Sequence, residues 1–134
     1  TTTVKQSKGG ITYTELSFAA QRGLPIADIV NKSGKAITPS GASVGSALKT
    51  AKVDTAKGDV RISPDYATAT PDAYPLAAPS YVLTCDKGNK NAALLKAYLT
   101  YVLTDGTGVL DKLGYAPLPD EIATQAKAKV AALA

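Results

Sequence analysis

The chain has 134 residues, of which 45% are hydrophobic and 19% are charged, so it is long and apolar enough to build a core. Its 15 basic and 11 acidic side chains give a net charge of +4, but the lysines are scattered without a basic run, which argues against nucleic-acid binding. No stretch approaches the ~20 consecutive apolar residues of a membrane span, and the absence of histidine excludes a Ser/His/Asp or Cys/His nucleophilic arrangement within the chain.

The first 40 residues predict short helices and strands in alternation. Residues 2–6 are expected to be the end of a helix that a glycine pair stops, and residues 11–14 predict a short strand. A helix is predicted over 15–22, because a glycine follows it. Residues 27–30 and 35–38 predict two strands joined by an Asn-Lys-Ser-Gly turn, and therefore a hairpin.

The middle of the chain begins with a helix and then loses its pattern. Ser40 is expected to cap a helix over 41–51, whose apolar residues repeat at helical spacing. Val53, Val60 and Ile62 predict one broken strand, and two Pro-Asp turns follow it. This weak stretch is the best candidate for a crossing between domains.

The segment from residue 81 onward carries the strongest apolar patterns. Residues 81–85 predict a near-continuous apolar strand, as expected where helices cover both faces of a sheet. In the helix that follows, with Asn89 or Asn91 as its cap, the apolar residues fall on one broad side: Leu94, Leu95, Tyr98, Leu99, Tyr101 and Val102.

After this helix the sequence predicts a turn, a further apolar turn of helix and a last helix. Residues 104–108 are interpreted as a turn, since they lack the lysine and the spacing of a phosphate loop. Gly114 is expected to stop the apolar turn that follows, and two prolines keep residues 115–119 extended. The helix that begins at Pro119 or Asp120 carries two acids in its first turn, which are expected to interact with the helix dipole. Glu15 is interpreted in the same way, as an acid in the first turn of its helix and not as a catalytic base.

Three segments, in order, resemble the PstS-type phosphate-binding proteins of ABC uptake systems. They are Gly9 to Ala19, which reads GGITYTELSFA; Tyr74 to Leu83, which begins with Tyr-Pro-Leu; and Lys112 to Pro119, which reads KLGYAPLP. Thr12 departs from the glycine that is usual in the family. The resemblance covers almost the whole chain but only the C-terminal portion of a full-length member.

The resemblance implies an α/β architecture, namely a partial periplasmic-binding-protein-like fold of type II that forms the C-terminal part of two lobes. Residues 1–52 would belong to the second lobe, residues 53–73 to a hinge or crossing segment, and residues 74–134 to the C-terminal part of the first lobe. The implied function is non-enzymatic: the substrate-binding component of an ABC-type phosphate uptake system.

The resemblance carries over no phosphate-binding residue, because the family's main donors lie in the absent N-terminal part. Neither Arg22 nor Arg61 precedes a Ser-Gly-Thr, and residues 40–43 are interpreted as a plain helix cap. No catalytic residue, metal site or cofactor is expected. Cys85, the one cysteine, is either a small core residue or half of a disulfide to an upstream segment.

The implied partners are inorganic phosphate and the ABC permease subunits, on the extracellular side of the cytoplasmic membrane, in a periplasmic or cell-surface lipoprotein form. No signal peptide is found at the start of the sequence, so the chain is cytosolic, mature or truncated, and the resemblance favours truncation. The alternative function is a stand-alone interaction module. Such a module would complement a separate N-terminal half, or exchange strands with itself in a homo-oligomer.

Overall fold

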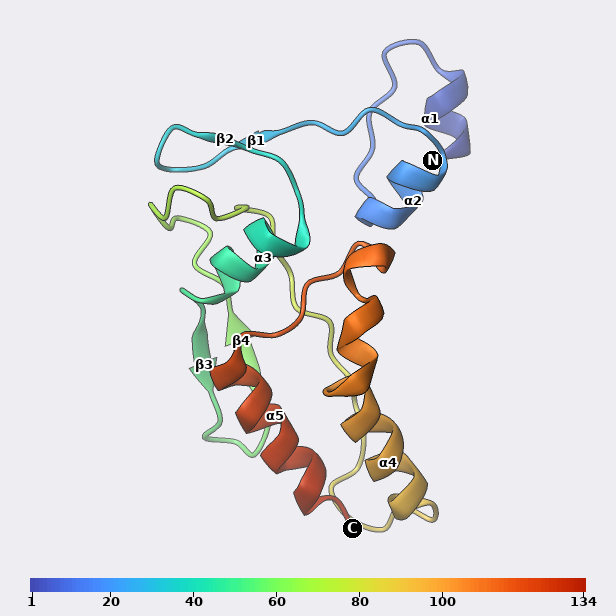
Figure 1. Cartoon of the computed structure of the whole chain (residues 1–134), viewed down its shortest axis with the longest axis vertical. Helices are drawn as coiled ribbons and strands as arrows, with labels where there is room; N and C mark the ends of the chain where they lie inside the picture. Colours follow the sequence, from blue (N-terminus) through green and yellow to red (C-terminus); the bar gives the residue numbers. More distant parts are fainter.

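The computed structural model describes residues 1–134 as five α-helices, two short 3₁₀ helices and two two-stranded sheets (Figure 1). The helices are α1 Thr2–Gln6, α2 Leu16–Gln21, α3 Gly41–Leu48, α4 Ala92–Val102 and α5 Asp120–Ala132, with the 3₁₀ helices η1 Asp105–Val109 and η2 Asp111–Leu113. The strands are β1 Ile29–Val30, β2 Ala36–Ile37, β3 Lys52–Asp54 and β4 Arg61–Ser63. The mixture of helices and strands agrees with the expected α/β class.

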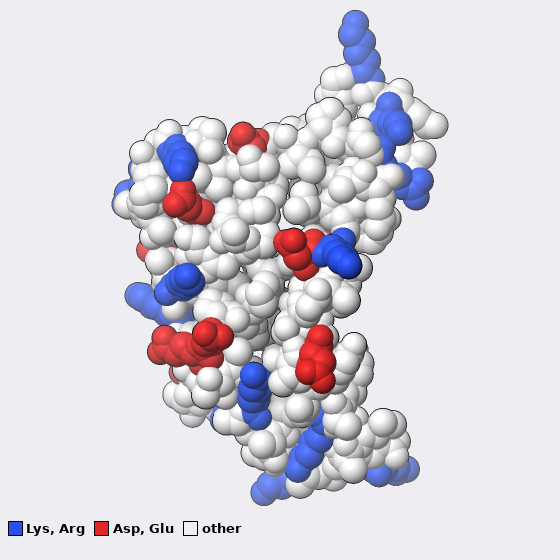
Figure 2. All heavy atoms as spheres, in the orientation of Figure 1, with Lys and Arg blue, Asp and Glu red and all other residues white.

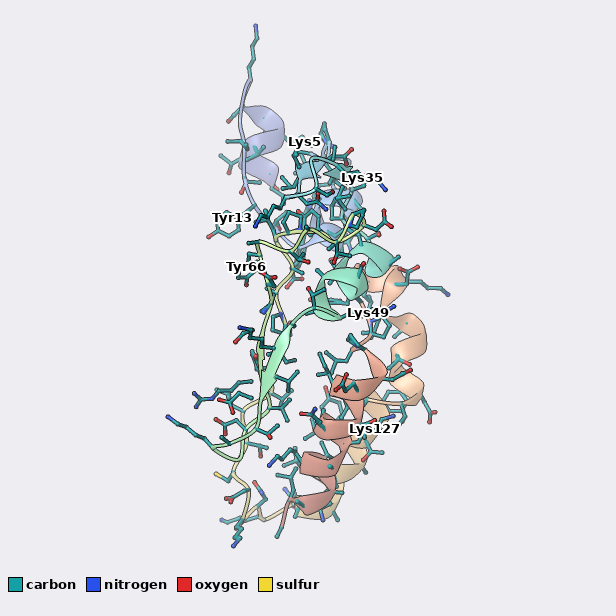
Figure 3. The ribbon with its side chains drawn as sticks, turned by 90° about the vertical axis from the view of Figure 1, so that its left-hand side faces the viewer. Lys5, Tyr13, Lys35, Lys49, Tyr66 and Lys127 are labelled. Atoms are coloured by element: carbon teal, nitrogen blue, oxygen red, sulfur yellow. The ribbon has the colours of Figure 1, made fainter.

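The elements form an elongated molecule without a central sheet. Helices α4 and α5 contact each other along one end, whereas α1 and α2 lie at the opposite end (Figure 1). The β3–β4 hairpin and the extended chain that follows residue 74 lie on one side of the molecule, and α4 and α5 lie on the other (Figure 3). No helix is both long enough and apolar enough to cross a membrane.

Both sheets are antiparallel hairpins. The hairpin predicted around residues 31–34 is confirmed: Ile29 pairs with Ile37, although the strands are only two residues long. The broken strand predicted from Val53 to Ile62 is instead a second hairpin, in which these two residues face each other. Each strand finds its partner within a few residues, which is why these two pairings form in a chain of this size.

Helix α3 begins as predicted. The Ser40 side chain accepts from the Ser43 amide at 3.1 Å, and the Ser43 hydroxyl accepts from the Ser40 amide at 2.9 Å, which is a capping box. The helix ends at Leu48, three residues before the expected end, and Thr50 donates back to the Ala47 carbonyl instead of continuing it.

Two predicted strands are wrong. Residues 11–14 and 81–85 are extended but pair with nothing, and Ile11, Tyr13 and Leu83 are 93%, 99% and 93% exposed. Figure 3 shows Tyr13 pointing away from the ribbon. A strand exists only when a neighbour supplies its hydrogen bonds, and no backbone group of this chain bonds to the backbone of either segment. The expected helices over both faces of residues 81–85 are absent for the same reason.

The predicted cap residue of α4 is confirmed in position only. Asn91 occupies the cap position without a side-chain bond, and the Asn89 amide group donates to the carbonyls of Cys85 and Ala134 instead. Residues 104–108, predicted as a turn, contribute most of the 3₁₀ helix η1. Gly114 does stop the following turn, with a left-handed φ of 77°, and α5 starts at Asp120 after the extended residues 115–119.

The core is small. Only 13 of the 134 residues are buried, and no large side chain is fully enclosed. The central cluster consists of Ala47, Ala73 and Ala77, with Val44 packed against it. A core of alanines contributes little hydrophobic free energy, because each methyl removes little apolar surface from water.

Candidate functional site

The molecule has a wide groove in its surface. It has a volume of about 2310 Å³ and is lined by 55 residues, of which 33 are hydrophobic. Its walls come from the extended residues 76–84, from α4 and α5, and from the segment that leads into α2. The apolar lining indicates that the groove suits an apolar occupant more than a free anion.

One wall of the groove is residues 78–84, which we call the open strand. None of its backbone amides donates to another backbone group. The Tyr81 hydroxyl accepts from the Ile62 amide at 2.8 Å and donates to the Ile62 carbonyl at 3.1 Å. Tyr81 thereby occupies the outer edge of β4 and holds the open strand beside the hairpin.

Glu15 and Tyr115 connect two segments that resemble the phosphate-binding family. The Tyr115 hydroxyl donates to Glu15 Oε2 at 2.8 Å across 100 positions of sequence. This hydrogen bond to Glu15, together with desolvation and the nearby negative charge, raises the pKa of the Tyr115 phenol. The interpretation of Glu15 as a first-turn acid is therefore corrected: it precedes the first turn of α2, makes no cap bond there, and accepts from a tyrosine.

Gly114 strengthens the same junction. A Cβ at this position would lie 3.0 Å from the Ser17 amide nitrogen and 3.2 Å from Leu16 Cβ, so only glycine lets the two backbones approach this closely. The motif residues Gly114 and Glu15 thus serve the contact between α2 and the chain that leads into α5.

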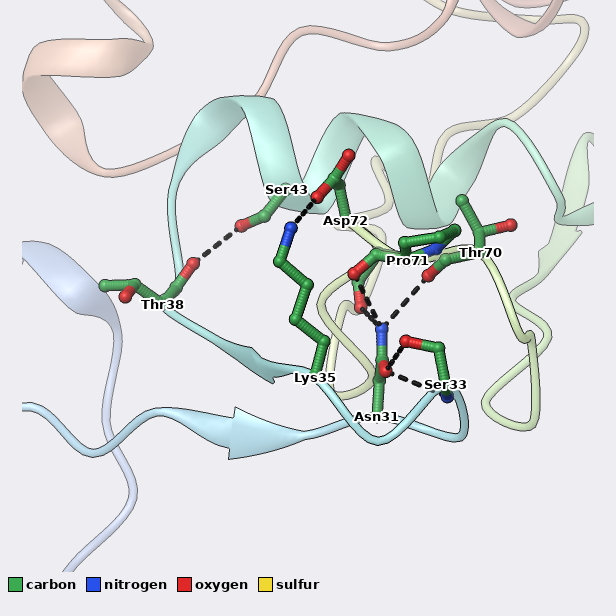
Figure 4. Close-up of polar contacts among 9 residues, drawn as sticks. Asn31, Ser33, Lys35, Thr38, Ser43, Thr70, Pro71 and Asp72 are labelled. Atoms are coloured by element: carbon green, nitrogen blue, oxygen red, sulfur yellow. Dashed lines mark hydrogen bonds and ion pairs between the residues drawn. The ribbon is translucent and has the colours of Figure 1, made fainter.

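A buried amide that the sequence analysis did not single out fixes the first hairpin (Figure 4). Asn31 is 6% exposed, and its Nδ2 donates to the carbonyls of Thr70, Pro71 and Ala73 at 3.0, 3.2 and 3.2 Å. Its Oδ1 accepts from the amide and the hydroxyl of Ser33. Its acceptors lie about 40 positions away, so only the turn-forming role of Asn31 is visible in the sequence.

Lys35 adds an ion pair with Asp72 at the same contact, so the β1–β2 turn and the Thr70–Ala73 segment are held by both polar and charged groups. Both partners are largely exposed, and the pair contributes little by itself. The contact makes the hairpin part of the scaffold.

The candidate side chains for metal or anion binding do not meet at one site. No group of three or more His, Cys, Asp or Glu side chains is placed to hold a metal ion. Arg61 is bonded to the nearby Asp59, at 2.9 Å from one guanidinium nitrogen. The Ser40 hydroxyl and the Ser43 amide are used in the helix cap, as predicted, and are not available to an anion.

Charges are scattered over the face drawn in Figure 2, without a basic or acidic patch. Asp120 and Glu121 lie in the first turn of α5, as predicted, where the helix dipole favours them. The interpretation of Cys85 as a core residue is wrong, because the side chain is exposed and free. A disulfide from Cys85 to an upstream segment stays a prediction.

Comparisons with known proteins agree with the resemblance read from the motifs. The model of the PBP superfamily domain matches residues 1–106. The chain is 32% identical to Phosphate-binding protein PstS 3 of Mycobacterium tuberculosis, over 97% of this chain and 36% of that protein. It is 30% identical to Phosphate-binding protein PstS of Methanocaldococcus jannaschii and 32% identical to that of Xylella fastidiosa, over 90% and 93% of this chain. The chain spans about a third of the length of these relatives.

Proposed function

This chain belongs to the PBP superfamily and is similar to PstS-type phosphate-binding proteins along nearly its whole length, and on that premise we propose that it is a scaffold portion of the substrate-binding component of an ABC-type phosphate uptake system. The observation that carries the proposal is the 32% identity over 97% of the chain. The motif contacts agree with it, since Glu15 and Gly114 belong to two of the segments that resemble the family and meet at one junction.

Within this proposal, the residues that ligate phosphate come from outside the chain. A dehydrated oxyanion needs several converging donors, such as helix N-terminal amides, hydroxyls and an arginine. Here the N-terminal cap of α3 is internally satisfied, and Arg61 is paired with Asp59. Residues 53–73 remain the proposed crossing between the lobe that contains residues 1–52 and the lobe that contains residues 74–134.

The proposed protein is not an enzyme, and it works on the extracellular side of the cytoplasmic membrane, where it hands phosphate to the permease. The relatives carry the name of phosphate-binding proteins, which supports a role in binding. Turnover of a phosphate ester by the 134-residue chain would contradict the non-enzymatic part of this proposal.

Calorimetric titration of phosphate tests the binding function. We expect heat of binding when phosphate is added to a PstS-type protein that contains this sequence and its complementing segments, and none when it is added to the 134-residue chain. Sulfate, titrated in parallel, shows whether the site selects phosphate. Absence of heat in the complete protein overturns the function, and binding by the chain alone overturns its role as scaffold.

A further inference from the structure

The hydrogen bond between Tyr115 and Glu15 joins the two lobes of the proposed function. Glu15 belongs to residues 1–52 and Tyr115 to residues 74–134, and the phenol oxygen lies 2.8 Å from the carboxylate oxygen that accepts its proton. Hydrogen bonds to a charged acceptor are stronger than those between neutral groups. Glu15 makes no cap bond to α2, so its carboxylate serves the contact with the other lobe and not its own helix.

The backbone around this hydrogen bond is also seated against the first lobe. A Cβ at Gly114 would lie 3.0 Å from the Ser17 amide nitrogen, at the start of α2. A Cβ at Gly41, the first residue of α3, would lie 2.9 Å from Asp111 Oδ1 and 3.5 Å from the Tyr115 carbonyl oxygen. Residues 111–116 therefore touch the starts of two helices that belong to the other proposed lobe.

These contacts lie away from the proposed crossing between the lobes. Helices α2 and η2 contact each other, and Figure 1 shows α2 on the side of the molecule opposite β4, which is part of the crossing residues 53–73. Two-lobe binding proteins close on their ligand by hinge motion, and a rotation about the crossing displaces distant contacts most. A hydrogen bond is lost when its two heavy atoms separate beyond about 3.5 Å. Opening of the lobes would therefore break the bond between Tyr115 and Glu15.

We propose that the Tyr115–Glu15 hydrogen bond is a latch, which holds the two lobes closed and thereby raises the affinity of the complete protein for phosphate. The inference rests on the proposed function. A contact that exists only in the closed state increases the population of that state, and the apparent affinity for a ligand rises with the fraction of protein that is competent to bind it. The two residues act through the position of the lobes and not through a contact with phosphate.

Calorimetric titration of phosphate into variants of a PstS-type protein that contains this sequence and its complementing segments tests the latch. Tyr115→Phe removes the donor and Glu15→Ala removes the acceptor, so we expect each to weaken phosphate binding about 5-fold. The double variant should bind no more weakly than either single variant, because both changes remove the same bond. Glu15→Gln keeps an acceptor oxygen and should bind within about 2-fold of the wild type.

A control variant and a second measurement separate the latch from a general loss of structure. Tyr66→Phe, at a tyrosine that is 60% exposed, should leave the phosphate affinity unchanged. Small-angle X-ray scattering without phosphate measures how open the lobes are. We expect Tyr115→Phe to increase the radius of gyration and Tyr66→Phe to leave it unchanged, whereas a bond that only stabilised the folded chain would change neither the affinity nor the radius.

The remaining results overturn the proposal. Unchanged phosphate affinity in Tyr115→Phe would show that the bond does not control closure, and tighter binding would assign the bond to the open state. Additive losses in the double variant would show that the two residues act separately. If the wild-type protein gives no heat with phosphate, the proposed function fails, and the scattering comparison still decides whether the bond holds the lobes together.

Discussion

At the scale of single residues, buried polar groups do more to define this structure than large apolar ones. The best example is Asn31, whose amide group donates to three carbonyls of the Thr70–Ala73 segment and so joins this segment to the β1–β2 turn. Leaving the buried Ala73 carbonyl without a donor costs the free energy of removing it from water. One side chain thereby stabilises a contact that the small alanine core does not.

We expect Asn31→Ala to lower the free energy of unfolding by about 1–3 kcal/mol, because alanine leaves the Pro71 and Ala73 carbonyls without a donor, whereas the Thr70 carbonyl still accepts from the Ala73 amide. Urea denaturation followed by circular dichroism measures the change. Asn91→Ala is the control, since Asn91 is exposed and its side chain makes no hydrogen bond, and it should change stability little. Equal effects of the two substitutions would show that the Asn31 bonds are not important in solution.

The hydrogen bond between Tyr115 and Glu15 makes stability depend on pH in the alkaline range. The folded state raises the pKa of the Tyr115 phenol above its ordinary value of 10.0, chiefly through the hydrogen bond to Glu15. The folded state therefore keeps this proton at a pH where the unfolded chain loses it. The stabilisation is fully present below pH 10.0 and is lost as the pH rises through the folded pKa.

Tyr115→Phe removes this dependence. We expect the wild-type chain to be more stable than the variant near neutral pH, and the difference to shrink as the pH rises above 10.0. Urea unfolding at a series of pH values measures the difference. Tyr66→Phe, at an exposed tyrosine whose hydroxyl bonds to nothing, is the control and should change stability little near neutral pH. A constant difference for Y115F would contradict the role of the phenol proton.

At the scale of elements, α3 shows how a short helix is specified by its ends. It has eight residues, which is too few for a stable isolated helix. Its start is fixed by the capping box between Ser40 and Ser43, and the buried Ser43 hydroxyl also donates to the Thr38 carbonyl at 2.9 Å. The cap therefore joins the helix to the strand that precedes it.

Ser43→Ala is expected to destabilise the chain by about 1–2 kcal/mol, because it removes one half of the capping box and leaves the Thr38 carbonyl without this donor. Ser46→Ala is its counterpart in the same helix: the Ser46 side chain makes no hydrogen bond, and alanine is the better helix former. Thermal unfolding of both variants separates the cap from simple propensity. If S46A were as destabilising as S43A, the cap would not be the cause.

The elements that the sequence predicted correctly are those whose signals are local. The Ser40 cap, the glycine after α2 and Gly114 after η2 mark helix ends within a few residues, and the β1–β2 turn places its two strands next to each other. Residues 11–14 and 81–85 were also predicted as strands, but no other backbone segment of the chain pairs with them, and composition alone gives a strand no hydrogen bonds.

The candidate site was predictable only in part. The motif segments predicted the family, and the Glu15–Tyr115 contact lies between two of them. The groove and the open strand were not predicted, because both depend on which surfaces the other segments of the chain leave uncovered. The role of Asn31 was missed for a related reason: its acceptors are distant in sequence and are backbone carbonyls, which leave no trace in residue type.

At the scale of the whole molecule, the accessible surface of 9238 Å² exceeds the about 6,600 Å² of a compact monomer of 13.7 kDa, and this excess should appear in the response to denaturant. The slope of the unfolding free energy against urea concentration is proportional to the surface that unfolding exposes. An unfolded chain of 13.7 kDa exposes about 19,900 Å². Folding to a surface of 9238 Å² therefore buries about one fifth less than folding to a compact monomer of the same mass.

We expect the urea slope of the chain alone to lie about one fifth below that of compact proteins of this mass, and to rise when the complementing segment is bound. Val82→Asp should leave the slope of the free chain unchanged, because the side chain is already exposed. A slope equal to that of a compact protein would mean that the free chain closes its own groove in solution. The apolar side chains on the groove wall would then pack against one another, and the backbone groups of the open strand would no longer be exposed.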